Sequence, residues 1–381
     1  MQLPVSAEFV LLPATIVLIA LLIAAFAIRR LIRPRSTSIV LRRLRLVLLP
    51  LVALIALAVA VSTTWNAILA LHFRSPSVAP GAIYTVNGLP MHIFCTGKGS
   101  PTILLDAGLG DDSLVWDKIQ PALSRSTRVC SYDRAGFGWS APGPDPQDAN
   151  SVTRQLHGLL QQAGVHGPIV LMGHSAAGLY IRDYASRFPQ DIAGLVFVDA
   201  STPLQDTRWS PQLRSEENKD YRSHELLIKT VQVLGIARLR GFCSAIEPGV
   251  EPYLSELHFE HECNEPIAAI QQERTAFRRS GNQTVRTGPF GDLPILVISR
   301  DPAHSLHDPV GLAAEHASVW NQMQEELKLL STRSRRIIAE GSGHQVMNDR
   351  PDVLEREVPR FIEQIRTQSF PPTELGTTTT E

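Results

Sequence analysis

The chain has 381 residues and a formal charge of −1 at pH 7, so acidic and basic residues are balanced. A nucleic-acid-binding protein usually carries a basic stripe or a high pI, and this balance argues against that class. Hydrophobic residues make up 44% of the chain, which permits a sizeable core, but they are distributed unevenly.

Two long apolar runs stand near the N-terminus, at 9–28 and 46–65, and neither contains a charged residue. A helix of about 20 residues rises about 30 Å, which matches the hydrocarbon thickness of a bilayer. Residues 29–45 contain several arginines and no acid, so the positive-inside rule predicts that this loop lies in the cytoplasm. We therefore expect residues 1–66 to form a membrane-anchoring hairpin of two transmembrane helices, with the main domain on the extracytoplasmic side.

Two alternatives stay open for this segment. Arg42, Arg43 and Arg45 precede the second apolar run, and Ala58-Val59-Ala60 resembles the cleavage site of a signal peptide. Cleavage near Ala60 would also deliver the main domain outside the cytoplasm. The other alternative is the inverted topology of the hairpin.

The cysteines divide into two pairs by their surroundings. An extracytoplasmic domain permits disulfides, and Cys243 and Cys263, which share one irregular region, are the better candidate pair. Cys95 and Cys130 lie in apolar, strand-like runs, so we expect them to be buried free thiols. The sequence by itself does not choose among the complete pairings.

From about residue 82, short apolar segments alternate with amphipathic ones. The apolar segments are rich in Val, Ile and Leu and are continuous, which is typical of strands buried on both faces of a parallel sheet. The predicted strands are Ile83–Val86, Met91–Cys95, Thr102–Asp106, Arg128–Tyr132, Ile169–Met172, Leu195–Asp199, Ile295–Ser299 and Arg336–Ala339.

Segments 149–163, 312–330 and 351–366 repeat apolar residues with the 3.6-residue period of an amphipathic helix. The alternation predicts an α/β fold: an eight-stranded, mostly parallel sheet with helices on both faces. Its core would be formed by 82–200 and 291–367.

Two further segments do not follow this alternation. Residues 201–290 show no clear strand and are too long for a plain loop, so we expect a helical cap inserted over the site. Residues 368–381, which end in a run of threonines and Glu381, are expected to form a disordered tail.

The strand at 169–172 leads into Gly173-His174-Ser175-Ala176-Ala177-Gly178, and a helix follows. A nucleophile elbow is a sharp turn between a strand and a helix that raises a serine above the sheet. Small residues are needed two positions before and after the serine, and Gly173 and Ala177 occupy those places. The pattern predicts Ser175 as a nucleophile; a structural serine in a tight turn is the alternative.

A serine hydroxyl needs a base to become a nucleophile. His344 follows the predicted strand 336–339 in the turn Gly341-Ser342-Gly343, where a histidine has little packing role. We therefore expect His344 to be the base. A histidine that only serves the turn is the alternative.

The base needs an acid that holds its tautomer and stabilises its charged form. Asp301 and Asp199 both follow predicted strands, and both fit the chain order serine, acid, histidine. We favour Asp301 and keep Asp199 as the alternative acid, with Asp308 as a third candidate. Asp301 precedes Pro302 and also fits a plain turn.

The oxyanion that forms during acyl transfer needs N–H donors that are already in position. One is expected from Ala176, directly after the nucleophile. The second is expected from Leu109, in a loop whose flanking Gly108 and Gly110 permit a tight backbone. A plain glycine turn is the alternative.

The order of these motifs resembles the α/β-hydrolase fold family, in its serine-nucleophile esterase and lipase-like branch. Ile93-Phe-Cys-Thr-Gly-Lys-Gly-Ser-Pro-Thr-Ile-Leu-Leu-Asp-Ala-Gly-Leu-Gly110 looks like the opening of such a protein, and Ser131-Tyr-Asp-Arg-Ala-Gly-Phe-Gly-Trp-Ser140 resembles the turn after its fourth strand. The likeness covers roughly 82–367 and implies a cap after the sixth strand. Ala177 and the position of Asp301 near its strand end depart from the family pattern.

The resemblance also separates branches of the family. Epoxide hydrolases and haloalkane dehalogenases place Asp at the position of Ser175, so both are disfavoured. Cofactor-free perhydrolases and carbon–carbon bond hydrolases keep Ser. No metalloprotease, phosphate-loop or dinucleotide motif is present, and His258, His261 and Cys263 match no familiar metal spacing.

Together these features predict a membrane-tethered serine hydrolase that cleaves a carboxylic ester, or an amide, through an acyl-enzyme on Ser175. The expected substrate is a small-molecule or lipid-like ester, with no cofactor, metal or nucleic acid. The alternatives are an acyltransferase or cofactor-free perhydrolase with the same triad, and a non-catalytic hydrolase-like binding module. The oligomeric state stays open.

Overall fold

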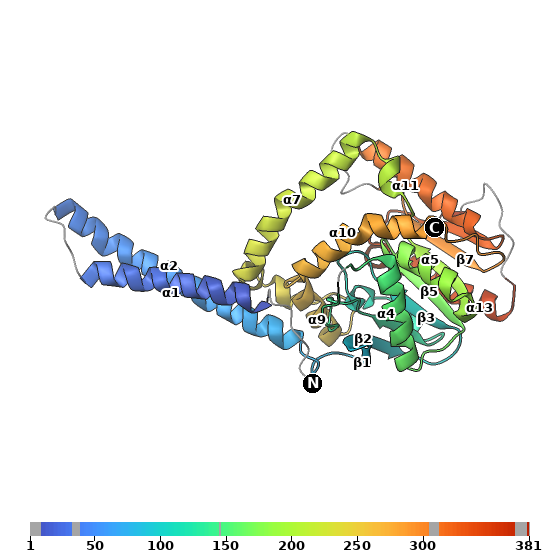
Figure 1. Cartoon of the computed structure of the whole chain (residues 1–381), viewed down its shortest axis with the longest axis horizontal. Helices are drawn as coiled ribbons and strands as arrows, with labels where there is room; N and C mark the ends of the chain where they lie inside the picture. Colours follow the sequence, from blue (N-terminus) through green and yellow to red (C-terminus); the bar gives the residue numbers. More distant parts are fainter. Residues whose placement is uncertain (1–8, 33–38, 145, 305–311, 370–378, 381) are drawn as a thin grey trace.

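A computed structural model describes residues 9–32, 39–144, 146–304, 312–369 and 379–380. A long helical hairpin projects from one end of an α/β domain, and further helices lie over the sheet (Figure 1). The described chain therefore contains a helical hairpin, a sheet with helices on it, and a helical segment between β6 and β7.

The hairpin consists of α1 (Leu11–Ile32) and α2 (Ile39–Phe73). Both helices are long and apolar enough to cross a membrane. Small side chains line the seam between them and allow close approach, as is common between membrane helices; they are Ala20, Ala24, Ala56 and Ala60. Helix α2 continues beyond its apolar run and ends against the α/β domain.

The sheet contains the eight predicted strands and one short addition. Its order is β1-β2-β4-β3-β5-β6-β7-β8-β9; β2 is antiparallel to both of its neighbours, β1 and β4, and every pair from β4 onward in this order is parallel. The strands are β1 (Ala82–Val86), β2 (Leu89–Thr96), β3 (Thr102–Asp106), β4 (Val129–Tyr132), β5 (Ile169–His174), β6 (Ile192–Val198), β7 (Ile295–Arg300), β8 (Ser334–Ala339) and β9 (Thr379–Thr380).

Helices cover both faces of the sheet, as the strand–helix alternation predicts. One apolar layer packs the sheet against α4 (Ala149–Gln162), α5 (Ala177–Arg187) and α11 (Ala313–Leu327). The other packs it against α13 (Pro351–Arg366), whose apolar stripe is buried except for the partly buried Ile365. Short helices complete the domain: η2 (Ser113–Trp116), α3 (Gln120–Leu123), η3 (Pro189–Asp191), η5 (Lys328–Leu330) and α12 (Val346–Asp349).

The segment between β6 and β7 is helical, and α10 crosses above the sheet (Figure 1). Two of its helices, α7 and α9, begin with Pro at their first position, where the missing N–H costs nothing. Its elements are α6 (Gln205–Arg208), α7 (Pro211–Val233), α8 (Ile236–Leu239), η4 (Phe242–Ser244), α9 (Pro252–Glu262) and α10 (Ile267–Thr284). We refer to residues 201–290 as the cap.

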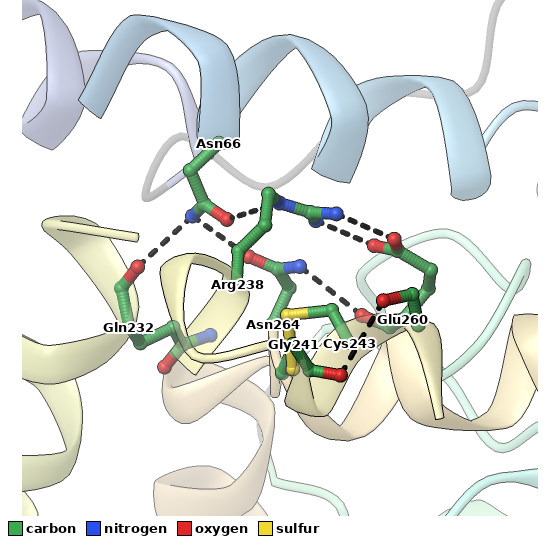
Figure 2. Close-up of a disulfide and its surroundings, with 9 residues drawn as sticks. Asn66, Gln232, Arg238, Gly241, Cys243, Glu260 and Asn264 are labelled. Carbon is green, nitrogen blue, oxygen red and sulfur yellow. Dashed lines mark hydrogen bonds and ion pairs between the residues drawn. A yellow bond between two sulfur atoms is a disulfide. The ribbon is translucent and has the colours of Figure 1, made fainter. Parts of the chain in front are cut away.

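Both cysteine pairs form disulfides. Cys243 and Cys263 join η4 to the end of α9, in agreement with the favoured pairing (Figure 2). The expectation of free thiols at Cys95 and Cys130 is wrong, because these residues form the second disulfide. They stand opposite each other in the antiparallel pairing of β2 with β4, a relationship that only the sheet order creates.

The C-terminal end departs from the expected disordered tail. Thr379 and Thr380 form β9, which pairs with Ile337 and Ile338 of β8. Strand β8 would otherwise leave its backbone groups unpaired at that edge of the sheet. Residues 370–378 lie outside the described part of the chain.

Candidate active site

Ser175 stands at the turn between β5 and α5. Its φ angle is 51°, in the left-handed region, which turns the chain sharply from strand to helix. A Cβ atom at Gly173 would lie 3.0 Å from the Ala177 carbonyl oxygen, so the turn has no room for a larger residue. Residues 169–185 are otherwise buried, and Ser175 alone among them is half-buried.

Gly178 lies too close to the segment after β6 to carry a side chain. A Cβ atom there would meet the Ser201 carbonyl oxygen at 2.6 Å and the Ala200 Cβ at 2.7 Å. Helix α5 therefore begins directly against the segment that follows β6. This contact brings the Ser175 turn next to the end of β6.

His344 follows β8, and its imidazole reaches Ser175. The His344 Nε2 atom lies 2.9 Å from Ser175 Oγ, with the hydroxyl placed to donate to the ring nitrogen. The imidazole is 37% exposed, so solvent or a ligand can reach it. The structure thus brings the predicted nucleophile and base together, although 169 positions separate them.

The acid beside His344 is Asp199, not Asp301. The His344 Nδ1–H group donates to Asp199 Oδ2 at 2.6 Å. Asp301 accepts hydrogen bonds from the backbone N–H groups of Ala303 and Gly341, which is the turn role considered as its alternative. The preference for Asp301 is corrected here, because Asp199 ends the strand next to β5 and therefore faces the elbow. Asp308 lies outside the described residues.

Asp199 is fully buried, and its carboxylate is held at both oxygens. Oδ1 accepts from the Arg300 backbone N–H at 3.0 Å and from Trp320 Nε1 at 2.8 Å. Burial alone would raise the pKa of Asp199, but the hydrogen bond and charge of His344, with Arg300 and Trp320, bring it below the ordinary value. The Asp199 carboxylate therefore stays ionised beside the His344 ring.

The loop after β3 passes beside the elbow, because Asp106 of β3 stands in register with Gly173 of β5. A Cβ atom on Gly108 would lie 2.8 Å from His174 Nδ1, so only glycine fits this approach. Within the described part of the chain, the N–H groups of Leu109 and Ala176 have no hydrogen-bond acceptor. Two free donors thus flank the elbow where the oxyanion site was expected.

A buried guanidinium holds this loop in shape. Arg134 donates to Asp106 Oδ1 at 2.9 Å, to the Ala107 carbonyl at 2.7 Å and to the Gly108 carbonyl at 2.5 Å. Its Nε donates to Glu273 Oε1 at 2.6 Å, and the other carboxylate oxygen of Glu273 accepts from Gly110 N at 3.0 Å. Glu273 belongs to α10, so the cap helix and the core share this network.

Arg134 lies in the 131–140 motif, but nothing in the sequence identifies Glu273. It is one of many charged residues in the cap, and its burial becomes visible only when α10 is packed on the loop. Tyr180 of α5 also donates to Glu273, so three elements meet at one carboxylate.

His174 is more than a packing residue. Its Nε2–H group donates to the His344 backbone carbonyl at 3.0 Å, and its ring lies 4.6 Å from the His344 ring. Burial, with the nearby His344, lowers the pKa of His174 to about 3, so the ring is neutral in ordinary conditions. A neutral ring in this position supports the His344 loop without adding charge beside the base.

A pocket of about 190 Å³ adjoins the site. It includes Gly110 and Gln345, the chain neighbours of Leu109 and His344, and one wall is formed by α9. Polar and charged side chains contribute much of its lining; they include Arg74, Asp111, Asp112, His258, His261, Glu262 and Glu265.

The residues weighed as a metal site have other partners. His258 Nδ1 lies 2.7 Å from Asp117, His261 Nδ1 lies 2.6 Å from Asp112, and Cys263 is in a disulfide. Burial would lower the pKa of His258, but Asp117 and Glu262 raise it to about 10. Both histidines therefore tie α9 to the core instead of forming an exposed cap surface.

Curated relatives resemble the chain at moderate identity. It is 28% identical over 281 residues to "Probable transporter efuK" of Hormonema carpetanum, covering 70% of this chain and 40% of that protein. An "AB hydrolase superfamily protein" of Gibberella zeae is 24% identical over 337 residues, covering 77% and 98%. The chain spans 40% of the length of the Hormonema carpetanum relative and 56% of the length of an uncharacterized protein of Schizosaccharomyces pombe that it also matches.

Solved structures with this fold include several hydrolases. A thermophilic esterase from Thermogutta terrifontis has a TM-score of 0.55 at 18% identity, with 75% of this chain and 99% of that chain covered. A membrane phospholipase A has a TM-score of 0.53 at 21% identity, with 84% and 98% covered. At these identities the likeness concerns the fold alone.

The family comparison covers most of the α/β domain. The sequence model of the alpha/beta hydrolase family matches residues 103–357, which is more than half of the chain and includes Ser175, Asp199 and His344. With a mostly parallel sheet that contains the eight predicted strands and β9, and with helices inserted between β6 and β7, the chain belongs to the alpha/beta hydrolase family.

Proposed function

We propose that the protein is a membrane-tethered serine hydrolase that cleaves carboxylic esters through an acyl-enzyme on Ser175. The observation that carries the proposal is the unbroken chain of hydrogen bonds from Ser175 Oγ through His344 to Asp199. A serine in a tight elbow, a partly exposed imidazole and a buried carboxylate have the roles that a nucleophile, a base and an orienting acid need.

In the first half of the reaction, Ser175 Oγ attacks the acyl carbon and His344 Nε2 takes its proton. The carbonyl oxygen becomes an oxyanion, which the N–H groups of Leu109 and Ala176 stabilise. His344 then gives the proton to the leaving alcohol, and the acyl group stays on Ser175. Asp199 holds the proton on Nδ1 throughout, so that Nε2 is free to act as the base.

In the second half, water enters in place of the alcohol. His344 Nε2 takes a proton from the water as the water oxygen attacks the acyl carbon. His344 then gives that proton to Ser175 Oγ as the acyl–Oγ bond breaks, which releases the free acid and restores Ser175. In this proposal the reacting and stabilising groups are the Ser175 and His344 side chains and the backbone amides of Leu109 and Ala176. The esterase and phospholipase among proteins of this fold are compatible with an ester substrate.

The membrane part of the proposal depends on α1 and α2. Each contains an uncharged run long enough to cross the hydrocarbon core, and most of their apolar side chains face away from the protein. The arginines between the runs favour a cytoplasmic turn and an extracytoplasmic catalytic domain. Such a tether would hold the site close to esters that reside in a bilayer.

A fluorophosphonate probe tests the nucleophile directly. We expect the full-length protein in detergent to be labelled and Ser175→Ala to be unlabelled. Ser201→Ala is the matched control, because Ser201 is buried beside the elbow and touches Ser175 through its backbone N–H. Absence of labelling in folded wild-type protein would contradict the proposal and favour a binding module.

Products distinguish hydrolysis from transfer. A chain-length series of p-nitrophenyl esters, analysed with and without added alcohol or peroxide, reports the fate of the acyl group. Release of free acid as the main product supports a hydrolase. Preferential formation of a new ester or a peracid would reject it.

A further inference from the structure

One stretch of the cap has an unusual composition. Residues 227–246 contain Lys229, Arg238 and Arg240 and no acid, among many aliphatic residues and Phe242. A segment with apolar and basic residues is typical of surfaces that lie in a membrane interface. We call residues 227–246 the cap rim.

The cap rim exposes large apolar side chains to an unusual degree. It comprises the end of α7, α8 and η4. Exposed fractions there are Leu227 59%, Ile228 47%, Ile236 36%, Leu239 62%, Phe242 62% and Ile246 65%. Single exposed apolar residues are ordinary in soluble proteins, but several within twenty residues mark a site of interaction.

The cap rim is also bound to the hairpin. Ser62 Oγ of α2 donates to the Leu234 carbonyl at 2.7 Å, and Asn66 Nδ2 donates to the Gln232 carbonyl at 2.9 Å. Arg238 Nε donates to Asn66 Oδ1 at 3.0 Å, and Figure 2 shows Asn66 directed into this part of the cap. In Figure 1 the lower end of α7 is the part of that helix nearest the hairpin.

These contacts fix the position along α2 at which the cap rim is attached. Ser62 belongs to the apolar run that ends at Trp65, and tryptophan is enriched where membrane helices meet the headgroups. Trp65 is 51% exposed and Ile68, one turn later, is 60% exposed. Because a helix rises about 1.5 Å per residue, Ser62 and Asn66 lie within roughly one turn of that boundary.

We propose that the cap rim is an interfacial membrane-binding surface that seats the cap in the leaflet around the outer end of the hairpin. This inference rests on the membrane-tethered hydrolase proposed above and names its substrate class as esters taken from the bilayer. Ile236, Leu239 and Phe242 enter the headgroup and acyl boundary. Lys229 and Arg240 face anionic lipid headgroups, whereas Arg238 is neutralised by Glu260.

Two pockets near the hairpin and the site have a lining residue in common. A mainly apolar pocket between the hairpin and the cap is lined by Phe9, Leu12, Ala70 and Val233. Glu265 lines both this pocket and the polar one beside Gly110 and Gln345. The apolar pocket is on the hairpin side and the polar pocket is next to the site. This order suits an amphiphilic ester whose apolar chain points toward the hairpin and whose polar part points toward the site.

Depth of insertion is the decisive measurement. The cysteines of the chain are all paired within the described residues, so a fluorophore such as NBD can be attached to an introduced thiol. Leu239→Cys and Phe242→Cys report the cap rim, Trp65→Cys reports the hairpin, and Leu329→Cys is the control. Leu329 is 61% exposed and lies on η5, outside the cap.

The labelled full-length proteins are placed in vesicles of phosphatidylcholine and phosphatidylglycerol that contain doxyl-labelled lipid. We expect blue-shifted, quenched emission from probes at 239 and 242, as at 65, and water-like emission at 329. If the probes at 239 and 242 behave like the probe at 329, the inference is overturned.

An activity ratio supplies a second test. For Leu239→Ser combined with Phe242→Ser, kcat/KM for a long-chain ester in vesicles, divided by that for a water-soluble ester, should fall roughly tenfold, because apolar burial is lost. An unchanged ratio would overturn the inference. The quenching result does not depend on catalysis, so failure of the proposed hydrolase activity would be recognised separately, by absent fluorophosphonate labelling.

Discussion

The His344 imidazole and the Asp199 carboxylate come from positions 145 residues apart, and Nδ1 lies 2.6 Å from Oδ2. This contact exists because β6 is the neighbour of β5 in the sheet, so the residue after β6 faces the Ser175 turn. Asp301 follows β7, one strand further from the elbow, and its carboxylate binds the turn before His344 instead.

Replacing Asp199 should therefore abolish most activity, and replacing Asp301 should not. Asp199→Asn can no longer hold the proton on His344 Nδ1, and we expect kcat to fall by about 10⁴, the size of this effect in serine proteases. Asp301→Asn should keep kcat within a few-fold of wild type. Kinetics on a soluble ester, with thermal unfolding to verify folding, make the comparison. An equal loss in both variants would contradict this assignment.

Gly108→Ala should impair catalysis without unfolding the protein. The new Cβ would lie 2.8 Å from both His174 Nδ1 and Asp111 Oδ2, so the loop that presents the Leu109 N–H must shift. Loss of one oxyanion donor typically costs a factor of about 100 to 1,000 in kcat, and we expect a drop of up to that size. Gly281→Ala in α10 is the control, since its nearest contact is at 3.4 Å. Wild-type kcat in Gly108→Ala would argue against this loop as the oxyanion site.

Glu273→Gln should weaken both stability and catalysis, because it removes a fully buried charge that faces Arg134. Leaving a buried partner uncompensated typically costs about 3 kcal/mol, so a lower Tm is expected. The Gly110 N–H also loses a carboxylate acceptor, and kcat should fall roughly tenfold as the loop loosens. Glu256→Gln, on the exposed side of α9, serves as the control. Equal Tm and equal kcat values for the two variants would contradict the prediction.

Acid should destabilise the protein partly through His174. The pKa of this ring is lowered to about 3 in the folded protein. Between that pH and the unfolded pKa, the unfolded chain binds a proton at His174 and the folded chain does not. Stability is unaffected by this residue above about pH 6.5, its unfolded pKa, and falls by about 1.4 kcal/mol per pH unit as pH drops toward 3.

His174→Gln should flatten that dependence, since Gln keeps a donor toward the His344 carbonyl but does not titrate. The residues beside this ring, His344 and Asp111, are present in both proteins. Thermal unfolding of both proteins between pH 7 and pH 4 provides the measurement. If the stability of both proteins falls equally between pH 7 and pH 4, the conclusion that the His174 ring is neutral in the folded protein would be contradicted.

Much of this protein was determined locally and was therefore readable in the sequence. The apolar runs of the hairpin, the continuous strands, the amphipathic helices, the Ser175 elbow and the His344 turn each depend on residues within one short segment. Propensity, periodicity and turn chemistry act over such segments, so the pattern of side chains specifies them before any packing occurs.

Other features were decided only when distant segments met. The pairing of Cys95 with Cys130, the choice of Asp199 over Asp301, the burial of Glu273 and the seating of the cap rim on α2 all depend on which strands and helices become neighbours. Sheet order and cap docking place side chains from far apart in the chain within hydrogen-bond distance, and no local pattern records that adjacency.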